Sequence, residues 1–478
     1  MNDREDDQKR TEEGKQRKDK KASKKYGMDL TDGPVLKKML LFCIPLMCSS
    51  ILQLLFNAAD IVVVGQFAGD NSLAAVGSNT ALINLLTNLF VGLSIGVNVL
   101  AARFYGAKQD EELSDTVHTA VFVGLASGIF LNIIGVFGAK QILVWMSTPD
   151  EVLQLATLYL RVYFFGMTAM MVYNFGSALL RAMGDTKRPL YYLLGSGIIN
   201  VMLNLFFVIV LRMDVAGVAL ATVISQCISA GLVVRCLIKE KGAMHLELKK
   251  IRLKRNIFAK ILQIGIPAGI QGVVFSLSNV VIQASVNAFG PTVMAGNSAA
   301  QNLEGFVYMA MNAFHQGAIT FTSQNMGAGR KDRIMRIALV AQLCVIMVGV
   351  VFGNGVVLFG HQLLGIYSGS TKVVEAGMVR LKMICTAYAL CGMMDVMVGL
   401  LRGLGYAVMP MIVSLIGACG LRLVWIATVF QIPKFHTIYM LYLSYAVTWI
   451  ITFLAHVICF YIGARKQGIF LQNKSFGK

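Results

Sequence analysis

The chain has few charged residues and few histidines for its length. Only 14% of its 478 residues are Asp, Glu, Lys or Arg, and 6 are histidine. No Ser/His/Asp arrangement and no metal-ligand constellation is recognisable, so we expect neither an enzyme nor a cofactor. The phosphate-binding motif Gly-x-x-x-x-Gly-Lys-Ser/Thr is also missing, which excludes ATP hydrolysis by this chain.

The nine cysteines lie in or at the ends of apolar stretches and show no Cys-x-x-Cys spacing. We therefore expect neither disulfides nor a structural metal site. No short apolar segment precedes a small-residue cleavage site, so we expect no cleaved signal peptide. The net charge of +18 is not accompanied by aromatic residues interleaved on a basic face, which argues against nucleic-acid binding.

What the chain has is apolar sequence. Hydrophobic residues make up 56% of it and the mean hydropathy is +0.65. A bilayer core about 30 Å thick is crossed by roughly 20 apolar residues in a helix. Twelve stretches qualify, near 37–67, 74–105, 112–145, 152–183, 188–211, 215–238, 256–287, 295–326, 333–358, 373–403, 408–430 and 437–464.

The second half of the sequence repeats the first. Residues 177–184, Ser-Ala-Leu-Leu-Arg-Ala-Met-Gly, return at 398–405 as Val-Gly-Leu-Leu-Arg-Gly-Leu-Gly. Six spans per half is an even number, so both halves enter the membrane from the same face. The sequence predicts an all-α membrane protein whose twelve transmembrane helices form two parallel six-helix lobes, related by a pseudo-two-fold axis along the membrane normal.

The distribution of Lys and Arg along the chain predicts its orientation in the membrane and its division into parts. Residues 235–260 hold nine Lys or Arg, whereas the alternate loops near 68–73 and 288–294 hold none, which places both termini and the linker in the cytoplasm. We expect a multi-pass protein of the plasma membrane. The predicted parts are a disordered cytoplasmic tail 1–36, an N-lobe 37–238, a cytoplasmic linker 239–255, a C-lobe 256–464 and a cytoplasmic tail 465–478.

Two prolines occupy equivalent places in the repeat. Pro45 and Pro267 each lie early in the first helix of a half, where proline removes a backbone hydrogen bond and allows a bend. An inert kink would explain them too, but the symmetric placement favours a hinge.

Asp60 is the most informative ionisable residue. It follows a long apolar run and shares one helical face with Gln53 and Asn57, whereas the second half has Ile282 at its position. A carboxylate inside a membrane helix is costly and asks for a function. It could exchange a proton or bind Na⁺, or be held structurally by a neighbouring helix.

Other polar residues are candidates for the same site or a second one. Asn200 and Asn204 lie four apart on one face of the fifth span, and Thr222 could complete a pocket with them. Glu304 and Asp395 are the acids of the second half. Either could bind a cationic substrate or pair with a cation such as Lys382.

Several short motifs occur together along the chain. They are Ile44-Pro45, Asp60 with Val64-Gly65, Leu73-Ala74-Ala75-Val76-Gly77, Leu180-Arg181-Ala182-Met183-Gly184-Asp185-Thr186, Gly217-Val218-Ala219-Leu220-Ala221-Thr222, Gln324-Asn325-Met326-Gly327-Ala328-Gly329 and Leu401-Arg402-Gly403-Leu404-Gly405. As a set they resemble the multidrug and toxic compound extrusion (MATE) family, over roughly residues 36–465. The Gln-Asn-x-Gly-Ala-Gly motif resembles the DinF-like bacterial branch.

The resemblance implies a V-shaped antiporter that exports organic compounds against an inward flow of H⁺ or Na⁺. It also implies a pocket in the N-lobe, whose residues fall here on Gln53, Asp60, Asn200, Asn204 and Thr222, with Asn174 or Ser177 from the fourth span. Two departures from the family bear on ion coupling. The family commonly has Asp at the position of Asn204, and Na⁺-coupled relatives carry a Glu in the seventh helix that 271–278 lacks.

We therefore expect a monomeric secondary antiporter for amphipathic, cationic organic compounds, with Asp60, Asn200 and Asn204 coupling transport to H⁺ or Na⁺. Its partners would be small organic substrates, the coupling cation and the lipid bilayer. The runner-up is a flippase for a lipid or lipid-linked saccharide, and a channel or receptor fits less well.

Overall fold

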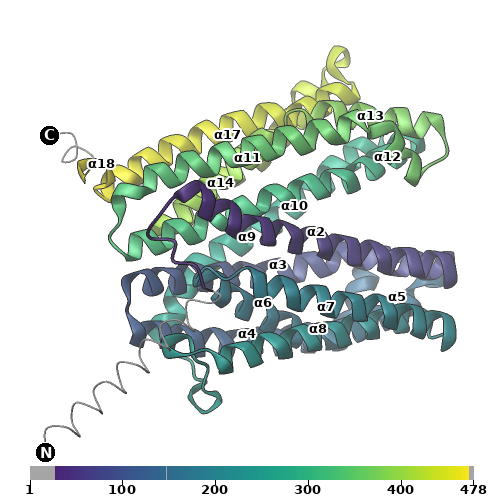
Figure 1. The fold of residues 1–478 in the computed structure, drawn as a ribbon. Coiled ribbons are helices and arrows are strands. Elements are labelled where there is room, and N and C mark those ends of the chain that lie inside the picture. The colour runs from purple at the N-terminus through teal and green to yellow at the C-terminus, as the bar shows by residue number, and fades with distance from the viewer. Residues whose placement is uncertain (1–26, 147, 473–478) are drawn as a thin grey trace, which may run out of the picture.

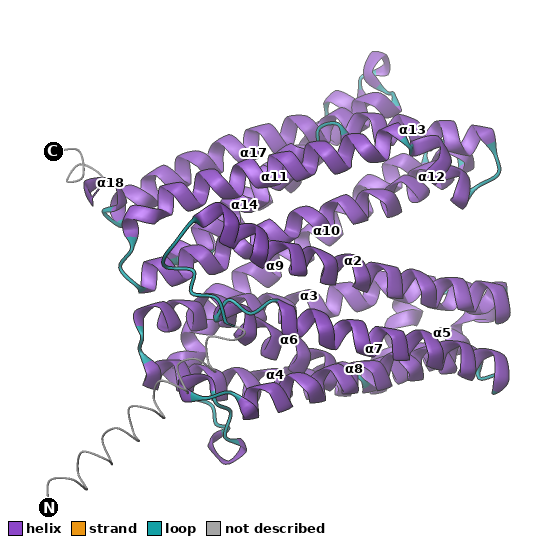
Figure 2. Cartoon of the chain, in the orientation of Figure 1, coloured by secondary structure: helices purple, strands orange, loops and turns teal. Residues whose placement is uncertain are grey.

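The computed structural model describes residues 27–146 and 148–472, and this part contains helices and loops but no strand (Figure 2). In the first half the helices are α2 (Val35–Phe67), α3 (Asp70–Ala107), α4 (Asp110–Trp145), α5 (Asp150–Phe165), α6 (Met167–Ala182), α7 (Lys187–Leu205) with the π-helical turn η1 (Phe206–Val210), and α8 (Asp214–Lys239). In the second half they are α9 (Arg255–Asn287), α10 (Pro291–Gly327), α11 (Ile334–Leu358), α12 (Gly360–Tyr367), α13 (Thr371–Cys385), α14 (Tyr388–Leu404), α15 (Val408–Ser414) with the π-helical η5 (Leu415–Gly420) and α16 (Leu421–Ala427), α17 (Ile438–Lys466) and α18 (Ile469–Gln472).

The prediction of twelve membrane-crossing helices is confirmed. Within the described residues, nine helices are long and apolar enough to cross a membrane. Two further spans are bent pairs, α5 with α6 and α13 with α14, at 45° and 46°. The twelfth is α10, which has 37 residues. Its hydropathy is lower because it buries polar side chains such as Glu304, Gln324 and Asn325.

The two halves repeat in three dimensions as well as in sequence. Gly69 and Gly290 precede the second helix of each half with φ of 91° and 96°, and Gly184 and Gly405 end equivalent helices with φ of 85° and 101°. Positive φ favours glycine because it has no Cβ to clash with the backbone. The bends of 45° and 46° also lie at equivalent places, so the duplication predicted from sequence is structural.

The first helix of each half connects both lobes. Near its start α2 buries Met39 and Phe42 in the hydrophobic core of the second half, whereas Val64 lies in the core of the first half. Helix α9 does the reverse, with Ile261 in the first core and Val286 in the second. The predicted lobes 37–238 and 256–464 are therefore not separate units, because their first helices cross between the two cores.

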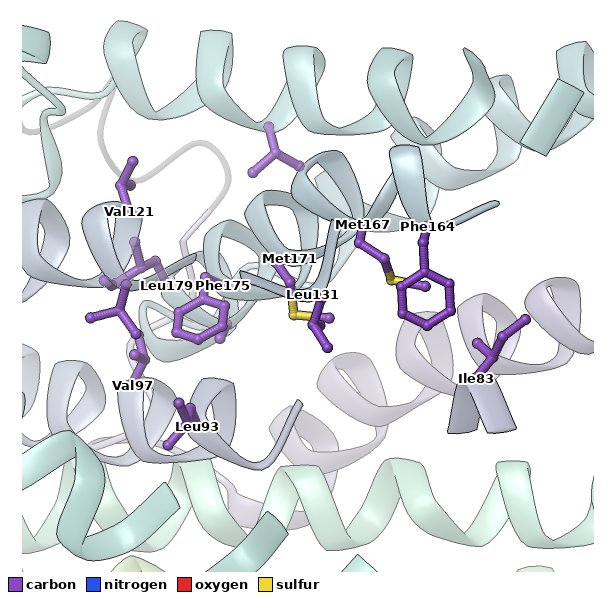
Figure 3. Packing of buried hydrophobic residues seen from close by; sticks show 14 of the residues in the cluster. Ile83, Leu93, Val97, Val121, Leu131, Phe164, Met167, Met171, Phe175 and Leu179 are labelled. Atoms are coloured by element: carbon purple, nitrogen blue, oxygen red, sulfur yellow. The ribbon is translucent and has the colours of Figure 1, made fainter. Parts of the chain in front are cut away.

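Away from these crossings each half has its own core. Figure 3 shows part of the first, where Leu131 of α4, Phe164 of α5, and Met171 and Phe175 of α6 pack together. All four side chains are less than 2% exposed. Close packing of apolar side chains makes each of these cores rigid.

Residues 27–34, which the sequence analysis placed in a disordered tail, are ordered and packed between the two halves. The Leu30 backbone N–H donates to Gln324 Oε1 at 3.2 Å, and Asn325 Nδ2 donates to the Leu30 carbonyl at 3.1 Å. Gln324 Nε2 also donates to the Ala182 carbonyl of α6 at 2.6 Å. We call residues 27–34 the strap. The tail prediction is wrong for the strap because paired backbone groups and the buried side chain of Leu30 hold it; residues 1–26 lie outside the described residues.

The C-terminal end of the described chain is also packed against the bundle. The Ile469 side chain is buried, and Lys331 Nζ donates to the Gln467 carbonyl at 2.8 Å. The predicted cytoplasmic tail 465–478 therefore begins with ordered residues, and 473–478 lie outside the described part. Between the two halves, α8 ends at Lys239 and α9 begins at Arg255.

The strap, the linker and α18 all lie at one end of the bundle (Figure 1). From this end the helices of the two halves diverge toward the opposite end (Figure 1). At the strap end α3 and α10 touch through their backbones, since a Cβ on Gly106 would lie 2.1 Å from the Gln324 carbonyl oxygen and one on Gly327 would lie 1.9 Å from that of Arg103. The halves are thus closed together at the strap end.

We predict that Gln324→Leu loosens this closed end. The variant leaves the Leu30 N–H and the Ala182 carbonyl without partners, at about 1–3 kcal/mol for each buried group. Thermal unfolding in detergent should shift to lower temperature, and amide hydrogen exchange should accelerate in residues 27–34. Gln342→Leu is the control, because Gln342 bonds only within the second half, to the Met393 carbonyl at 3.1 Å. Equal exchange at the strap in both variants would contradict the bridging role.

Candidate substrate and ion site

The first half encloses a cavity of about 400 Å³. Its walls come from α2, α3, α7, α8 and the bent pair α5–α6, and Met309 of α10 reaches it from the second half. Because both halves contribute, motion of one half against the other would change its shape. The residues predicted from sequence that line it are Gln53, Asn57, Asp60, Asn174, Asn200 and Thr222.

The carboxylate of Asp60 is surrounded by uncharged side chains that form hydrogen bonds. Its side chain is 9% exposed. Asn204 Nδ2 donates to Asp60 Oδ1, and Thr222 Oγ1 lies 3.3 Å from Asp60 Oδ2. Asn204 Nδ2 also lies 3.4 Å from Asn200 Oδ1, and Asn200 Nδ2 lies 3.4 Å from Thr222 Oγ1. The structure thus brings together the carboxylate and the polar residues of the fifth and sixth spans, α7 and α8, that were predicted to surround it.

Local sequence explains why these groups meet. Asn200 and Asn204 are four residues apart and share one face of α7. Gly197, one turn earlier, lets α2 approach closely, since a Cβ there would lie 1.8 Å from the Phe56 ring. The π-helical turn η1 begins at Phe206, directly after this face, and such turns are frequent at functional sites.

The hydroxyl of Thr222 has two acceptors within reach. Its Oγ1 lies 3.0 Å from the Val218 carbonyl and 3.3 Å from Asp60 Oδ2. A hydroxyl has one hydrogen to donate, so Thr222 bonds either its own helix or the carboxylate. The site can therefore change the number of donors that Asp60 receives without moving a helix.

Ser177, the second candidate of the fourth span, is buried and does not line the cavity. It lies on α6 three residues beyond Asn174, which does. Between the two alternatives left by the sequence, the structure thus places Asn174 at the cavity.

The acids of the second half are not at this cavity. Glu304 makes a buried two-pronged ion pair with Arg380, with Oε1 and Oε2 each 2.8 Å from a guanidinium nitrogen. Arg380 also donates to Asn297 Oδ1 at 2.7 Å. Of the two alternatives left open for Glu304, the structure shows pairing with a cation, but the cation is Arg380 and not the suggested Lys382, which lies on another face of α13 and is exposed.

Asp395 lies on α14 among side chains of the second half. It accepts a hydrogen bond from Tyr308 and has Arg402 nearby, and its backbone carbonyl lies 2.6 Å from His315 Nδ1. The cavity beside Asp60 does not include it. The structure therefore separates Glu304 and Asp395 from the other predicted site residues.

Several cavity residues were missed by the sequence analysis. Asn84, Asn88 and Tyr163 line the cavity, as does Gln226, one turn after Thr222. Asn88 Nδ2 donates to Ser276 Oγ of α9 at 3.3 Å, which ties the cavity wall to the other half. The signal was available as spacing, because Asn84 and Asn88 lie four apart in a long apolar stretch.

Among the described residues, no group of three or more His, Cys, Asp or Glu side chains is placed to hold a metal ion. The oxygens close to Asp60 come instead from amides and a hydroxyl. Two similar six-helix halves around a polar cavity with one buried acid are the architecture of a membrane transporter rather than an enzyme.

Comparison with known proteins defines the family. The MatE family model matches residues 45–206 and 267–428, once in each half, so the chain belongs to the MatE family. It is 26% identical over 395 residues to the "Probable multidrug resistance protein YoeA" of Bacillus subtilis, covering 81% of this chain and 85% of the relative. It is 23% identical over 393 residues to the "Probable multidrug resistance protein NorM" of Thermotoga maritima, covering 81% and 84%.

Solved structures share the fold. A transporter described as the "Outward-facing conformation of a multidrug resistance MATE family transporter of the MOP superfamily" matches with a TM-score of 0.85 and 20% identity, over 93% of this chain and 99% of that one. A "Crystal structure of MATE in complex with MaL6" matches with a TM-score of 0.84 and 20% identity, over 93% and 98%. These matches confirm the two-lobed, twelve-helix fold.

The contact between Asp60 and Asn204 can be tested by a double-mutant cycle. We expect Asn204→Ala to lower the free energy of unfolding by roughly 1–3 kcal/mol, because the carboxylate loses a buried donor. In an Asp60→Asn background the same change should cost less, with a coupling of at least 0.5 kcal/mol. Chemical unfolding in mild detergent measures both. Asn132→Ala, which removes an exposed hydrogen bond to the Phe165 carbonyl, is the control; strictly additive losses would show that the two side chains do not interact.

Proposed function

We propose that this protein is a multidrug exporter that moves amphipathic organic cations out of the cell in exchange for H⁺ or Na⁺. The single observation that carries the proposal is the cavity beside Asp60. Among the described lining residues Asp60 is the one ionisable acid, and none is Lys, Arg or His. An ionised Asp60 would give the cavity one negative charge, which suits either a small cation or a cationic substrate.

Competition for one carboxylate is the proposed coupling step. A proton or Na⁺ arriving at Asp60 would cancel the charge that holds an organic cation, and the cation would leave. Departure of the ion would restore the site. The oxygens of Asn200, Asn204 and Thr222 are of the type that hard cations such as Na⁺ prefer, and the same groups can hydrogen-bond a protonated acid.

The amide at position 204 suits this exchange better than a second acid would. An amide has both a donor nitrogen and an acceptor oxygen. Asn204 donates to Asp60 in the structure, and this arrangement suits an ionised acid. By turning its amide group over, it could accept from Asp60 when the acid is protonated. One carboxylate with an amide neighbour thus supports exchange of a single charge without a second titrating group.

Helix α2 offers a route from the site to the closed end. Asp60 lies 25 residues beyond Val35, about 38 Å along the helix. Between them lies Pro45, close to the place where α2 leaves one core for the other. We propose that a change at Asp60 bends α2 at Pro45 and shifts one half against the other, with Pro267 serving the same role in α9.

The names of the relatives support the substrate class. YoeA and NorM are named as probable multidrug resistance proteins, and a third relative, from Staphylococcus saprophyticus, as "Multidrug export protein MepA" at 22% identity over 371 residues. We propose a monomer in the plasma membrane with the strap end in the cytoplasm, as the basic linker favours. A flippase for lipid-linked saccharides is not favoured, because a phosphate-bearing cargo would call for cations, and the described cavity lining has none.

We predict that Asp60→Asn abolishes gradient-driven export while the protein still folds and inserts. The amide keeps the size and hydrogen-bonding capacity of the side chain but cannot carry the charge. Dye export in proteoliposomes, with the melting temperature measured alongside, tests this. Asp150→Asn, at an exposed acid at the start of α5, is the control and should transport normally. Normal export by Asp60→Asn would refute the assignment.

The coupling ion is decided by imposing H⁺ and Na⁺ gradients separately on the same proteoliposomes. We expect one of them to drive dye export by the unmodified protein and neither to drive it in Asp60→Asn. A fluorescent phospholipid in the same vesicles should show no ion-driven movement between leaflets. Lipid movement without dye export would favour the flippase instead.

A further inference from the structure

A second cavity lies on the outside of the bundle and is apolar. It has a volume of about 350 Å³ and lies where α3 and α4 of the first half meet α9 of the second. Its walls include Phe90, Leu93, Phe122, Phe130 and Ile266. Phe122 is 38% exposed, Phe130 53% and Ile266 39%, so the cavity opens outward as a groove. In a membrane-spanning bundle such a groove faces hydrocarbon rather than water.

The groove begins at the linker and follows α9 into the bundle. Leu253 of the linker and Phe258 line its start, and Ile266 lines its inner end. From Arg255 to Ile266 the helix rises about 16 Å. That is about half of a hydrocarbon core roughly 30 Å thick, so the groove has the depth of one leaflet.

Two cations lie at the start of the groove. Arg252 and Arg255 are exposed, and no acidic side chain in the described chain makes an ion pair with them. Lys260 lies on another face of α9, two residues from the groove-lining Phe258 and Leu262, and its ammonium group lies 5.5 Å from the centre of the Phe104 ring. Their neighbour Lys254 differs, since its ammonium group pairs with Asp115 of α4. The Arg252 carbonyl also accepts a hydrogen bond from Thr119 at 3.4 Å. These two contacts fix the linker on α4 and leave two charges in front of the groove.

We infer that this groove is a binding site for an anionic phospholipid, with one acyl chain in the groove and the phosphate between Arg252 and Arg255. Basic residues next to transmembrane helices attract anionic headgroups, and basic pockets between helices bind them specifically. A cationic cargo molecule would be repelled at the same place. A zwitterionic lipid would fill the groove but would gain little from the two cations.

A lipid at this site would affect the contact between the two halves. Leu93 lines the groove and also packs on Gly265, where a Cβ would lie 2.6 Å from the Leu93 Cα. A bound acyl chain would therefore lie along the contact between α3 and α9, which joins the two halves. Ligands that bind the assembled state stabilise it, so the lipid should raise the stability of this contact. The inference does not depend on the transported substrate.

The test uses the purified, delipidated full chain in detergent with equal amounts of phosphatidylglycerol and phosphatidylcholine of the same acyl chains. Native mass spectrometry counts the bound lipids of each kind. We expect phosphatidylglycerol to be preferred at least tenfold. The double variant Arg252→Gln, Arg255→Gln should lose that preference, at roughly fivefold per cation, and still bind phosphatidylcholine. Ala126→Trp, at an exposed groove position, should reduce binding of both lipids.

A matched control removes two exposed arginines of the second half, Arg336→Gln and Arg465→Gln. This variant should keep the preference for phosphatidylglycerol. Loss of the preference in the control as well would show a general charge effect and overturn the site. So would an unchanged preference in the groove double variant, or displacement of the lipid by an equal concentration of glycerol phosphate, which has a phosphate and no chain. Melting temperatures without lipid confirm that all variants are folded.

Discussion

Burial of one carboxylate is the constraint on which the rest of the first half depends. An ionised acid in a membrane protein is stable only if nearby groups replace the water it has lost. Here the replacements are an amide and a hydroxyl, from Asn204 and Thr222. They come from two other helices, so α2, α7 and α8 must meet within hydrogen-bonding distance. Gly197 makes the approach of α2 to α7 feasible, because any larger residue would collide with Phe56.

The second half has a similar backbone but different side chains at the equivalent positions. There the corresponding acid position is Ile282, which is buried in the core. The second half instead closes a full ion pair, Glu304 with Arg380, supported by Asn297 and Tyr442. A paired charge that is fully satisfied offers nothing to a mobile ion, whereas an acid with neutral partners does. The two halves thus share a backbone, and they surround Asp60 and Glu304 with different partners.

Much of the fold could be predicted because its signals are long and local. Spans of 20 or more apolar residues and a repeat offset of about 221 residues are visible without any contact information. The helical spacing of Asn200 and Asn204 likewise placed two site residues on one face. Asp60 was found because a charge in an apolar stretch is conspicuous.

The parts that could not be predicted depend on contacts between distant segments. The strap contains few apolar residues, and Gln324 and Asn325, nearly 300 positions away, hold it. The partner of Glu304 was missed by two residues, and two residues on a helix are about 200° apart, so Lys382 and Arg380 face different surroundings. The crossing of α2 and α9 between the cores was invisible for a similar reason, since an apolar face does not specify which apolar face it meets.

The crossing helices explain how a change at one acid could be felt by the whole molecule. If each first helix belonged to one lobe only, the lobes would meet only along their surfaces, and a local change at Asp60 would stay local. Because α2 is anchored by Phe42 in one core and by Val64 in the other, it cannot bend without moving one core relative to the other. The strap and Gln324 hold the start of α2 in place. A bend of α2 would therefore move the rest of the helix relative to this fixed end. Proline within the crossing helix, at 45 and again at 267, lies in the segment that such motion would bend.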